Sequence, residues 1–240
     1  MYGIILCEGE TDAILISYYL HKTLTYSYVK KSPANLPALT KISKSINWYR
    51  GDHDNYIAIC PIGGADFMKA VKEVIRYNKA ADEDDVFQKV VLVMDNDDES
   101  VCDSVKEIGK ALFCKRELSA GNWESFAYDN DFAQHIGGEI ACILQPNDEH
   151  GALETFVLQA LSQDDEEVEN AVRQVKEFVG GFQSKRYLRH RRDRVKAHLS
   201  VSLAVMCPSK TFTTIDEFLK GIEWNDYLLF QKQFKLFENM

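Results

Sequence analysis

The chain has 240 residues, of which 45% are hydrophobic, and a formal net charge of −9 at pH 7. This hydrophobic fraction is enough for a buried core and excludes wholesale disorder. The negative charge argues against indiscriminate coating of nucleic acid. No apolar run reaches the roughly 18–20 residues that a membrane helix needs, so no membrane partner is expected.

The N-terminal segment and the cysteines predict a cytoplasmic protein. The opening sequence MYGIILCEGE has no basic region before its short apolar run and reaches an acid at Glu8. That pattern is typical of a first strand and differs from a signal peptide. The six cysteines lie far apart with no C-x-x-C pair, which argues against a zinc or redox motif.

In the first part of the chain, short apolar runs alternate with amphipathic helical patterns. Strands are expected at residues 2–7, 56–60, 90–94 and 140–144, and helices at 11–21, 65–77 and 100–113. This alternation predicts right-handed βαβ crossovers and a parallel sheet, in which ligands bind at the carboxyl ends of the strands. Residues 24–54 interrupt the pattern as an insertion, where residues 25–29 favour an edge strand.

After about residue 150 the pattern becomes helical throughout. Apolar residues recur at helical spacing within residues 153–161, 168–179, 186–206 and 227–237. We therefore predict an α/β fold, with a catalytic core at residues 1–148 and a helical extension at residues 149–240 packed on it. The aromatics of the last helix are expected in the core or in a subunit contact.

Acidic residues follow two of the predicted strands at the point where each strand ends. Glu8 and Asp12 come after the first strand, and Asp95 and Asp97 come after the third. Neighbouring parallel strands would bring these carboxylates to one rim, where their mutual repulsion would raise their pKa values. A hard divalent cation relieves that repulsion, so the pattern favours Mg²⁺ or Mn²⁺.

These residues resemble the Toprim motif shared by topoisomerases, bacterial primases and overcoming-lysogenization-defect nucleases. The matching segments are residues 8–12 (Glu-Gly-Glu-Thr-Asp) and 95–97 (Asp-Asn-Asp), and the resemblance covers about residues 2–145. It implies a Rossmann-like Toprim core in which Glu8 is a general acid/base or metal ligand. The metal ligands that it implies are Glu8, Asp12, Asp95 and Asp97.

The nuclease branch of this family adds a downstream glutamate and a lysine that complete a site for two ions. Glu154 resembles the glutamate, and Lys196 resembles the lysine better than Lys210 does. The implied cofactor is Mg²⁺ or Mn²⁺, bound as two ions. One departure is that the glycine usual after the second aspartate is replaced here by Asp98.

A basic segment stands out in this acidic chain. Lys185, Arg189, Arg192 and Lys196 follow the spacing i, i+4, i+7, i+11, which would align them on one face of a helix over residues 186–206. Such a stripe can neutralise phosphates of DNA or RNA. The alternative is a solvated face, or a face that pairs with the acidic helix at residues 164–177.

Other site types fit less well. Ser100 and Lys106 stand where an EF-hand needs glycine and glutamate, and the sequence has no P-loop, no G-x-G-x-x-G and no H-E-x-x-H. The pair Gly63-Gly64 predicts a strand-to-helix turn, whose amides could alternatively hold a phosphate.

The leading hypothesis is a metal-dependent endonuclease that cleaves DNA or RNA with two ions. The resemblance also suggests an effector of mobile-element or antiviral defence, with a partner ATPase or another defence protein, and leaves a homodimer open. The alternatives are a non-catalytic Toprim docking module and a phosphohydrolase of small nucleotides.

Overall fold

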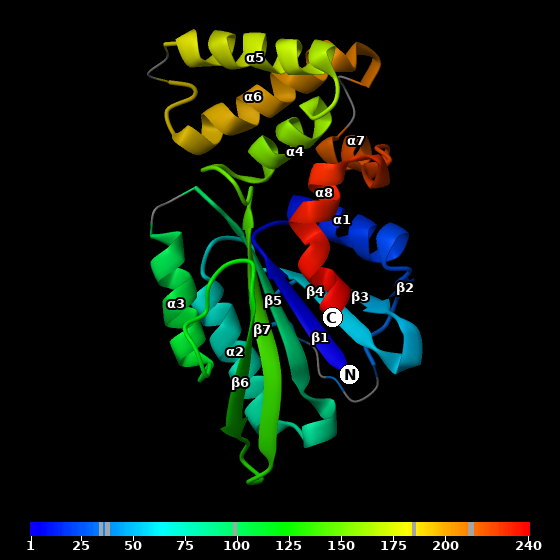
Figure 1. Cartoon of the computed structure of the whole chain (residues 1–240), viewed down its shortest axis with the longest axis vertical. Coiled ribbons are helices and arrows are strands. Elements are labelled where there is room, and N and C mark those ends of the chain that lie inside the picture. The colour runs from blue at the N-terminus through cyan, green and yellow to red at the C-terminus, as the bar shows by residue number, and fades with distance from the viewer. Residues whose placement is uncertain (34–35, 37–38, 98–99, 184–185, 211–213) are drawn as a thin grey trace.

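A seven-stranded sheet lies at the centre of the protein (Figure 1). The computed structural model describes residues 1–33, 36, 39–97, 100–183, 186–210 and 214–240. The strand order is β2-β3-β4-β1-β5-β7-β6. The strands are β1 (Tyr2–Cys7), β2 (Ser27–Val29), β3 (Asn47–Arg50), β4 (Tyr56–Pro61), β5 (Phe87–Asp95), β6 (Trp123–Asp129) and β7 (His135–Gln145).

The four inner strands β4, β1, β5 and β7 pair in parallel, as predicted. Their continuous apolar runs are explained by burial on both faces. On β1, Ile4 and Leu6 belong to one hydrophobic core, whereas Ile5 and Cys7 belong to the other. Since β1 lies between β4 and β5, the acids that follow β1 and β5 come from neighbouring strands.

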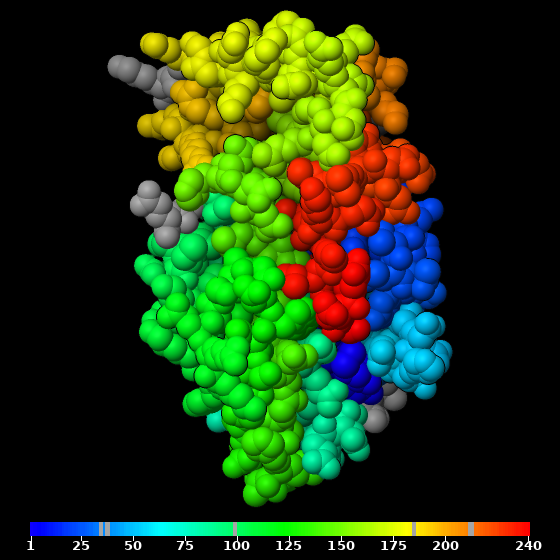
Figure 2. Space-filling model, in the orientation of Figure 1, coloured from blue at the N-terminus to red at the C-terminus, as the bar shows by residue number. Residues whose placement is uncertain are grey.

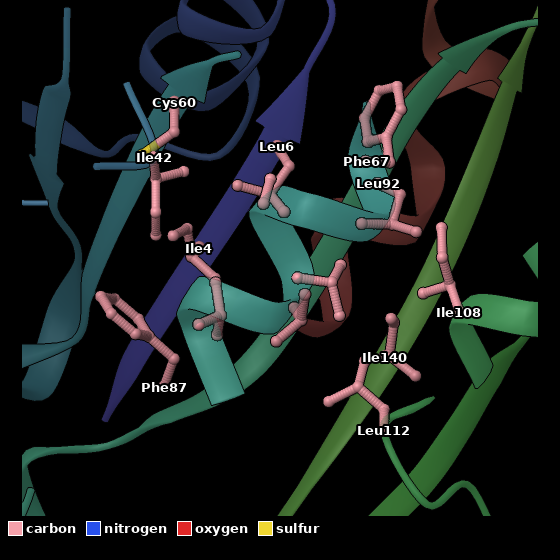
Figure 3. Packing of buried hydrophobic residues seen from close by; sticks show 14 of the residues in the cluster. Ile4, Leu6, Ile42, Cys60, Phe67, Phe87, Leu92, Ile108, Leu112 and Ile140 are labelled. Atoms are coloured by element: carbon pink, nitrogen blue, oxygen red, sulfur yellow. The ribbon is translucent and has the colours of Figure 1, made fainter. Parts of the chain in front are cut away.

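The first core lies between the sheet and helices α2 (Phe67–Ala80) and α3 (Val101–Ala111) (Figure 3). The amphipathic pattern predicted over residues 65–77 is confirmed, because Phe67, Val71 and Val74 are fully buried against the sheet. Helix α2 begins where the Asp66 side chain accepts a hydrogen bond from the Lys69 amide at 3.1 Å.

The second core lies on the opposite face and joins the two ends of the chain. It contains α1 (Glu10–Tyr18), a π-helical turn (Tyr19–Thr23), α4 (Leu153–Ser162), α8 (Leu228–Phe234) and a final 3₁₀ turn (Lys235–Asn239). The ring of Tyr19 lies 5.7–6.0 Å from the rings of Phe230, Phe234 and Phe237. Figure 2 shows the red C-terminal segment against the blue N-terminal part. The domain division at residue 148 stays a prediction.

Helices α4, α5 (Glu166–Gly181) and α6 (Arg191–Met206) lie beyond the carboxyl edge of the sheet (Figure 1). Helix α7 (Ile215–Lys220) packs against α1, and short 3₁₀ turns lie at Asp52–Asp54, Glu83–Asp85, Pro208–Lys210 and Trp224–Asp226. No helix in the described part of the chain is long and apolar enough to cross a membrane.

Two strands and one helix boundary differ from the sequence prediction. Strands β3 and β6 were not expected: both pair antiparallel toward the sheet edges, where the apolar runs of inner strands are absent. The edge strand expected at residues 25–29 is β2. The helix expected over residues 186–206 begins only at Arg191, because the backbone at Leu188 has a positive φ of 53°.

Candidate active site

A cavity of about 230 Å³ lies at the carboxyl edge of the sheet, between the ends of β1 and β5 and the helices α4 and α6. Its acidic lining residues come from three separate segments and its basic ones from the start of α6. The acids are Glu8, Asp12, Asp95, Asp97 and Glu154, and the bases are Arg191, Arg192 and Lys196. The structure therefore brings together all five carboxylates that the sequence singled out.

Glu8 is held at the end of β1 by its backbone and by its side chain. The amides of Gly63 and Gly64 donate to the Glu8 carbonyl oxygen at 3.0 and 3.1 Å. Gly63 has a φ of 75°, which disfavours any residue with a Cβ. The Glu8 Oε1 accepts a hydrogen bond from the Asp95 amide at 3.1 Å. The glycine turn thus positions Glu8, and its amides are already engaged instead of being available to a phosphate.

Asp12 and Asp95 accept hydrogen bonds from backbone amides at the starts of two helices. The Asp12 Oδ2 accepts from the Gly9 amide at 2.9 Å, and this side chain is only 7% exposed. The Asp95 Oδ1 accepts from the amide of Leu153, the first residue of α4, at 3.2 Å. The N-terminal end of a helix favours a negative charge, so both acids have a local reason for their positions.

Burial and mutual repulsion raise the pKa of three of these acids. Burial, together with the nearby Glu8 and Asp12 carboxylates, raises the pKa of Asp95 to about 8. Burial, followed by repulsion from Glu8, raises the pKa of Asp12 to about 7. The pKa of Glu8 is also raised, mainly by burial, although the Asp95 amide and the Arg192 guanidinium oppose the rise. The cavity therefore holds more negative charge than its surroundings balance.

The first turns of α6 bring three cations to the cavity. Arg192 and Lys196 are one turn apart on this helix, and both line the cavity. Arg191 donates a hydrogen bond from Nη1 to the backbone carbonyl of Asp97. The helix starts at a cap in which the His190 amide donates to Asp193 Oδ2 at 3.2 Å.

The predicted basic stripe is only partly correct. Arg189 precedes α6, so it cannot share a helical face with Arg192 and Lys196, and Lys185 lies outside the described residues. Lys210 lies beyond the far end of α6, with its ammonium 6.0 Å from the ring centroid of Phe218. Of the two candidate lysines, Lys196 is the one that lines the cavity.

Arg191 lines the cavity but was not predicted from the sequence as a site residue. It belongs to the noted basic segment, but it lies off the face defined by the predicted helix register. Arg191 reaches the cavity because α6 begins at this residue and because its guanidinium contacts the Asp97 carbonyl. The contact with the Asp97 carbonyl has no signal in the local sequence, because it joins groups 94 residues apart.

Comparison with known proteins adds a family and a fold. Residues 2–220 match the family described as "Protein of unknown function (DUF3226)". The chain belongs to this family. No curated protein matches the chain.

Among solved structures, a hypothetical protein from Pyrococcus horikoshii OT3 is similar over 96% of this chain and 98% of its own, with 15% identity and a TM-score of 0.54. This similarity shows a shared fold. A lactoylglutathione lyase from Agrobacterium tumefaciens aligns over 58% of this chain and 91% of its own, with 11% identity. Its TM-score of 0.17 is too low to indicate a common fold.

The cavity of this DUF3226 member has the oxygen donors of a divalent-cation site, but the carboxylates that the structure describes there are not close enough together to bind an ion. Among the described residues, no three His, Cys, Asp or Glu side chains are close enough together to hold an ion. One oxygen of Asp12 and one of Asp95 already accept hydrogen bonds from backbone amides. The lining nevertheless offers five carboxylates and no histidine, and oxygen-only donors suit Mg²⁺ or Mn²⁺. Binding would require carboxylate side chains to move closer together.

We expect the protein in EDTA to lose stability as the pH rises from about 5 to about 8. Unfolded aspartates release their protons near pH 4. Folded Asp12 and Asp95 keep theirs until about pH 7 and 8. The folded state therefore binds more protons in this window, and its free energy of unfolding falls as the pH increases.

This pH dependence can be measured as the melting temperature at pH 5, 6, 7 and 8. Asp95→Asn keeps a hydrogen-bond acceptor for the Leu153 amide and removes the titrating group. The variant should therefore gain most over the wild type at pH 8 and least at pH 5. Equal differences at both pH values would contradict a raised pKa at Asp95.

Proposed function

We propose that this protein is a metal-dependent nuclease that hydrolyses phosphodiester bonds in DNA or RNA. The observation that supports this proposal best is the composition of the cavity: five carboxylates beside three cations, at the carboxyl ends of parallel strands. Carboxylates suit metal ions, and the cations suit the phosphate that the ions would act on. In parallel α/β sheets this edge is where ligands bind.

The residues of the cavity divide the chemistry between them. Arg192 and Lys196 are exposed on α6 and would attract the negatively charged backbone. Glu8 is half-buried, its pKa is raised, and its carboxylate is oriented by the Asp95 amide. Those features suit a base that takes a proton from the attacking water. Ions held by Asp95, Asp97 and Glu154 would polarise the scissile phosphate and stabilise the leaving oxygen.

The Toprim resemblance supports the same assignment. Residues 8–12 and 95–97 follow adjacent parallel strands, which is the arrangement that the resemblance implies. Glu154 lies at the start of α4 beside them, and Lys196 supplies the lysine that the nuclease branch requires. The residue after Asp97 lies outside the described part of the chain.

A second candidate is a phosphohydrolase that acts on small nucleotides. A cavity of about 230 Å³ has room for a phosphate group with its ions but not for a base pair. This size favours a substrate that presents a single phosphate from a flexible chain or from a mononucleotide. A non-catalytic docking module would need neither the buried acids nor a metal.

Incubation of the purified protein with plasmid, single-stranded DNA, tRNA and mononucleotides tests these candidates together. We expect cleavage of a polynucleotide in Mg²⁺ or Mn²⁺ and none in EDTA. Release of phosphate or nucleoside from mononucleotides alone would favour the second candidate. Binding without any hydrolysis would favour the docking module.

We expect Lys196→Gln to reduce cleavage by at least tenfold while changing nucleic-acid binding much less. The reason is that Lys196 lines the cavity, so it would act on the scissile phosphate, whereas binding is shared among several arginines. Its loss should flatten the salt dependence of binding by about 0.7–0.9, the value for one phosphate contact. Lys210→Gln is the matched control, because Lys210 lies away from the cavity. Equal losses in the two variants would contradict the role of Lys196.

The proposal extends to cellular context through the Toprim resemblance alone. It suggests a cytoplasmic effector of mobile-element or antiviral defence that works with an ATPase or another defence protein. A homodimer belongs to the same set of expectations. Co-purification with the products of neighbouring genes and measurement of the solution mass would test both.

A further inference from the structure

Exposed aromatic side chains gather where α5 ends and before α6 begins. Phe178, Phe182 and Tyr187 are 64%, 46% and 58% exposed and lie within ten residues of sequence. Phe178 lies in the last turn of α5, and Phe182 is the residue that directly follows this helix. Large apolar groups exposed together mark a binding surface more often than isolated ones do.

Arginines are frequent in the segment that follows Phe182. Five of the nine residues at 186–194 are arginine, in a chain whose net charge is −9. The guanidinium of Arg186 lies 5.3 Å from the ring centroid of Tyr187, and Arg189 and Arg191 are exposed. We call Phe178, Phe182, Tyr187, Arg186, Arg189 and Arg191 the aromatic–arginine surface.

Two contacts connect this surface to the cavity. Arg194 donates from Nη1 to the carbonyl of Val179, the neighbour of Phe178, at 3.4 Å, which fixes the end of α5 against the first turn of α6. Arg191 in that same turn donates to the Asp97 carbonyl at the cavity. Figure 1 shows the end of α5 and the start of α6 on the same side of the molecule as α3.

We propose that the aromatic–arginine surface binds single-stranded nucleic acid, stacking its bases on the rings and leading its backbone into the cavity. This inference rests on the proposed nuclease function and specifies its substrate class. Stacking on a side chain needs bases that are not already stacked in a duplex, and arginines neutralise the phosphates between them.

The test measures binding of fluorescently labelled 20-nucleotide single strands and a 20-base-pair duplex in EDTA, where no hydrolysis interferes. Single strands should bind more tightly than the duplex. Phe178→Ala and Phe182→Ala should each weaken single-strand binding about fivefold or more, the usual effect of one stacked base. Their salt dependence should stay unchanged because a ring neutralises no phosphate, whereas Arg189→Gln should flatten it by about 0.7.

Phe132→Ala is the matched control. Phe132 is 62% exposed in the turn between β6 and β7, at the opposite edge of the sheet from the cavity. Phenylalanine variants that bind like this control, or a duplex that binds as tightly as the single strand, would overturn the inference. The inference would also be overturned if no nucleic acid bound in EDTA, or if Phe178 and Phe182 were needed only for binding a protein.

This experiment separates the inference from the proposed function. Stacking-dependent binding with no cleavage in Mg²⁺ or Mn²⁺ would support the inference and refute the nuclease. Cleavage in those ions that is indifferent to Phe178 and Phe182 would support the nuclease and refute the inference.

Discussion

Glu8→Gln should lower metal-dependent cleavage by at least 100-fold while leaving the fold intact. Glutamine keeps an oxygen that can accept the Asp95 amide, so the hydrogen bond at 3.1 Å can persist. It cannot accept a proton from water, and it removes a charge that would attract a divalent ion. Loss of a general base alone costs about 10²–10⁴ in rate. The measurement is the initial rate of cleavage of a polynucleotide in Mn²⁺, beside circular dichroism of the same sample.

Glu10→Gln is the control for this result. Glu10 is exposed, two residues further along the chain, and does not line the cavity. The Glu10→Gln variant should cleave at close to the wild-type rate. This result would exclude a general change in surface charge near α1 as the cause of the loss in Glu8→Gln. Cleavage by Glu8→Gln at an undiminished rate would remove the catalytic role of this carboxylate. The metal would then have to act without Glu8.

Mn²⁺ or Mg²⁺ should raise the melting temperature, and the Asp95→Asn/Asp97→Asn double variant should lose this response. A ligand that binds only the folded state at 100 times its Kd stabilises it by about 2.7 kcal/mol. For a chain of this size, that corresponds to a rise of about 5–10 °C. Burial, and after it the neighbouring Glu8 and Asp12 carboxylates, raise the pKa of Asp95, so an ion would remove a cost already present in the fold.

The same double variant should melt higher than the wild type when both are in EDTA at pH 8. Asparagine removes buried charge without leaving the Leu153 amide unpaired. The expected gain is about 2–8 °C, for about 1–2 kcal/mol. Asp131→Asn, in the exposed turn at the other edge of the sheet, should change neither temperature. A double variant that keeps the full response to Mn²⁺ would mean that the ions bind elsewhere.

The sequence by itself determined the parallel part of the sheet and the place of its acids. Strands buried on both faces need continuous apolar runs, so β1, β4, β5 and β7 could be recognised from short segments. A carboxylate directly after such a run must lie at the carboxyl edge. Glu8 and Asp95 could be predicted for that edge because one local rule is enough to place them there.

Tertiary structure decided which segments complete and cover that edge. Helices α4 and α6 pack against each other beyond the ends of β1 and β5, and together they bring Glu154, Arg192 and Lys196 to the cavity. The contact of Arg191 with the Asp97 carbonyl joins groups 94 residues apart.

Strand β6 and the packing partner of the C-terminal helix were also beyond local pattern. Strand β6 lies at an edge and pairs antiparallel with β7, so its sequence lacks the apolar run of an inner strand. The helical spacing of Phe230 and Phe234 predicted a buried face, but only the folded chain shows that this face packs on Tyr19. The physical reason is that the spacing of apolar residues indicates which face of a segment is buried. The segment that covers this face depends on contacts between residues far apart in the chain.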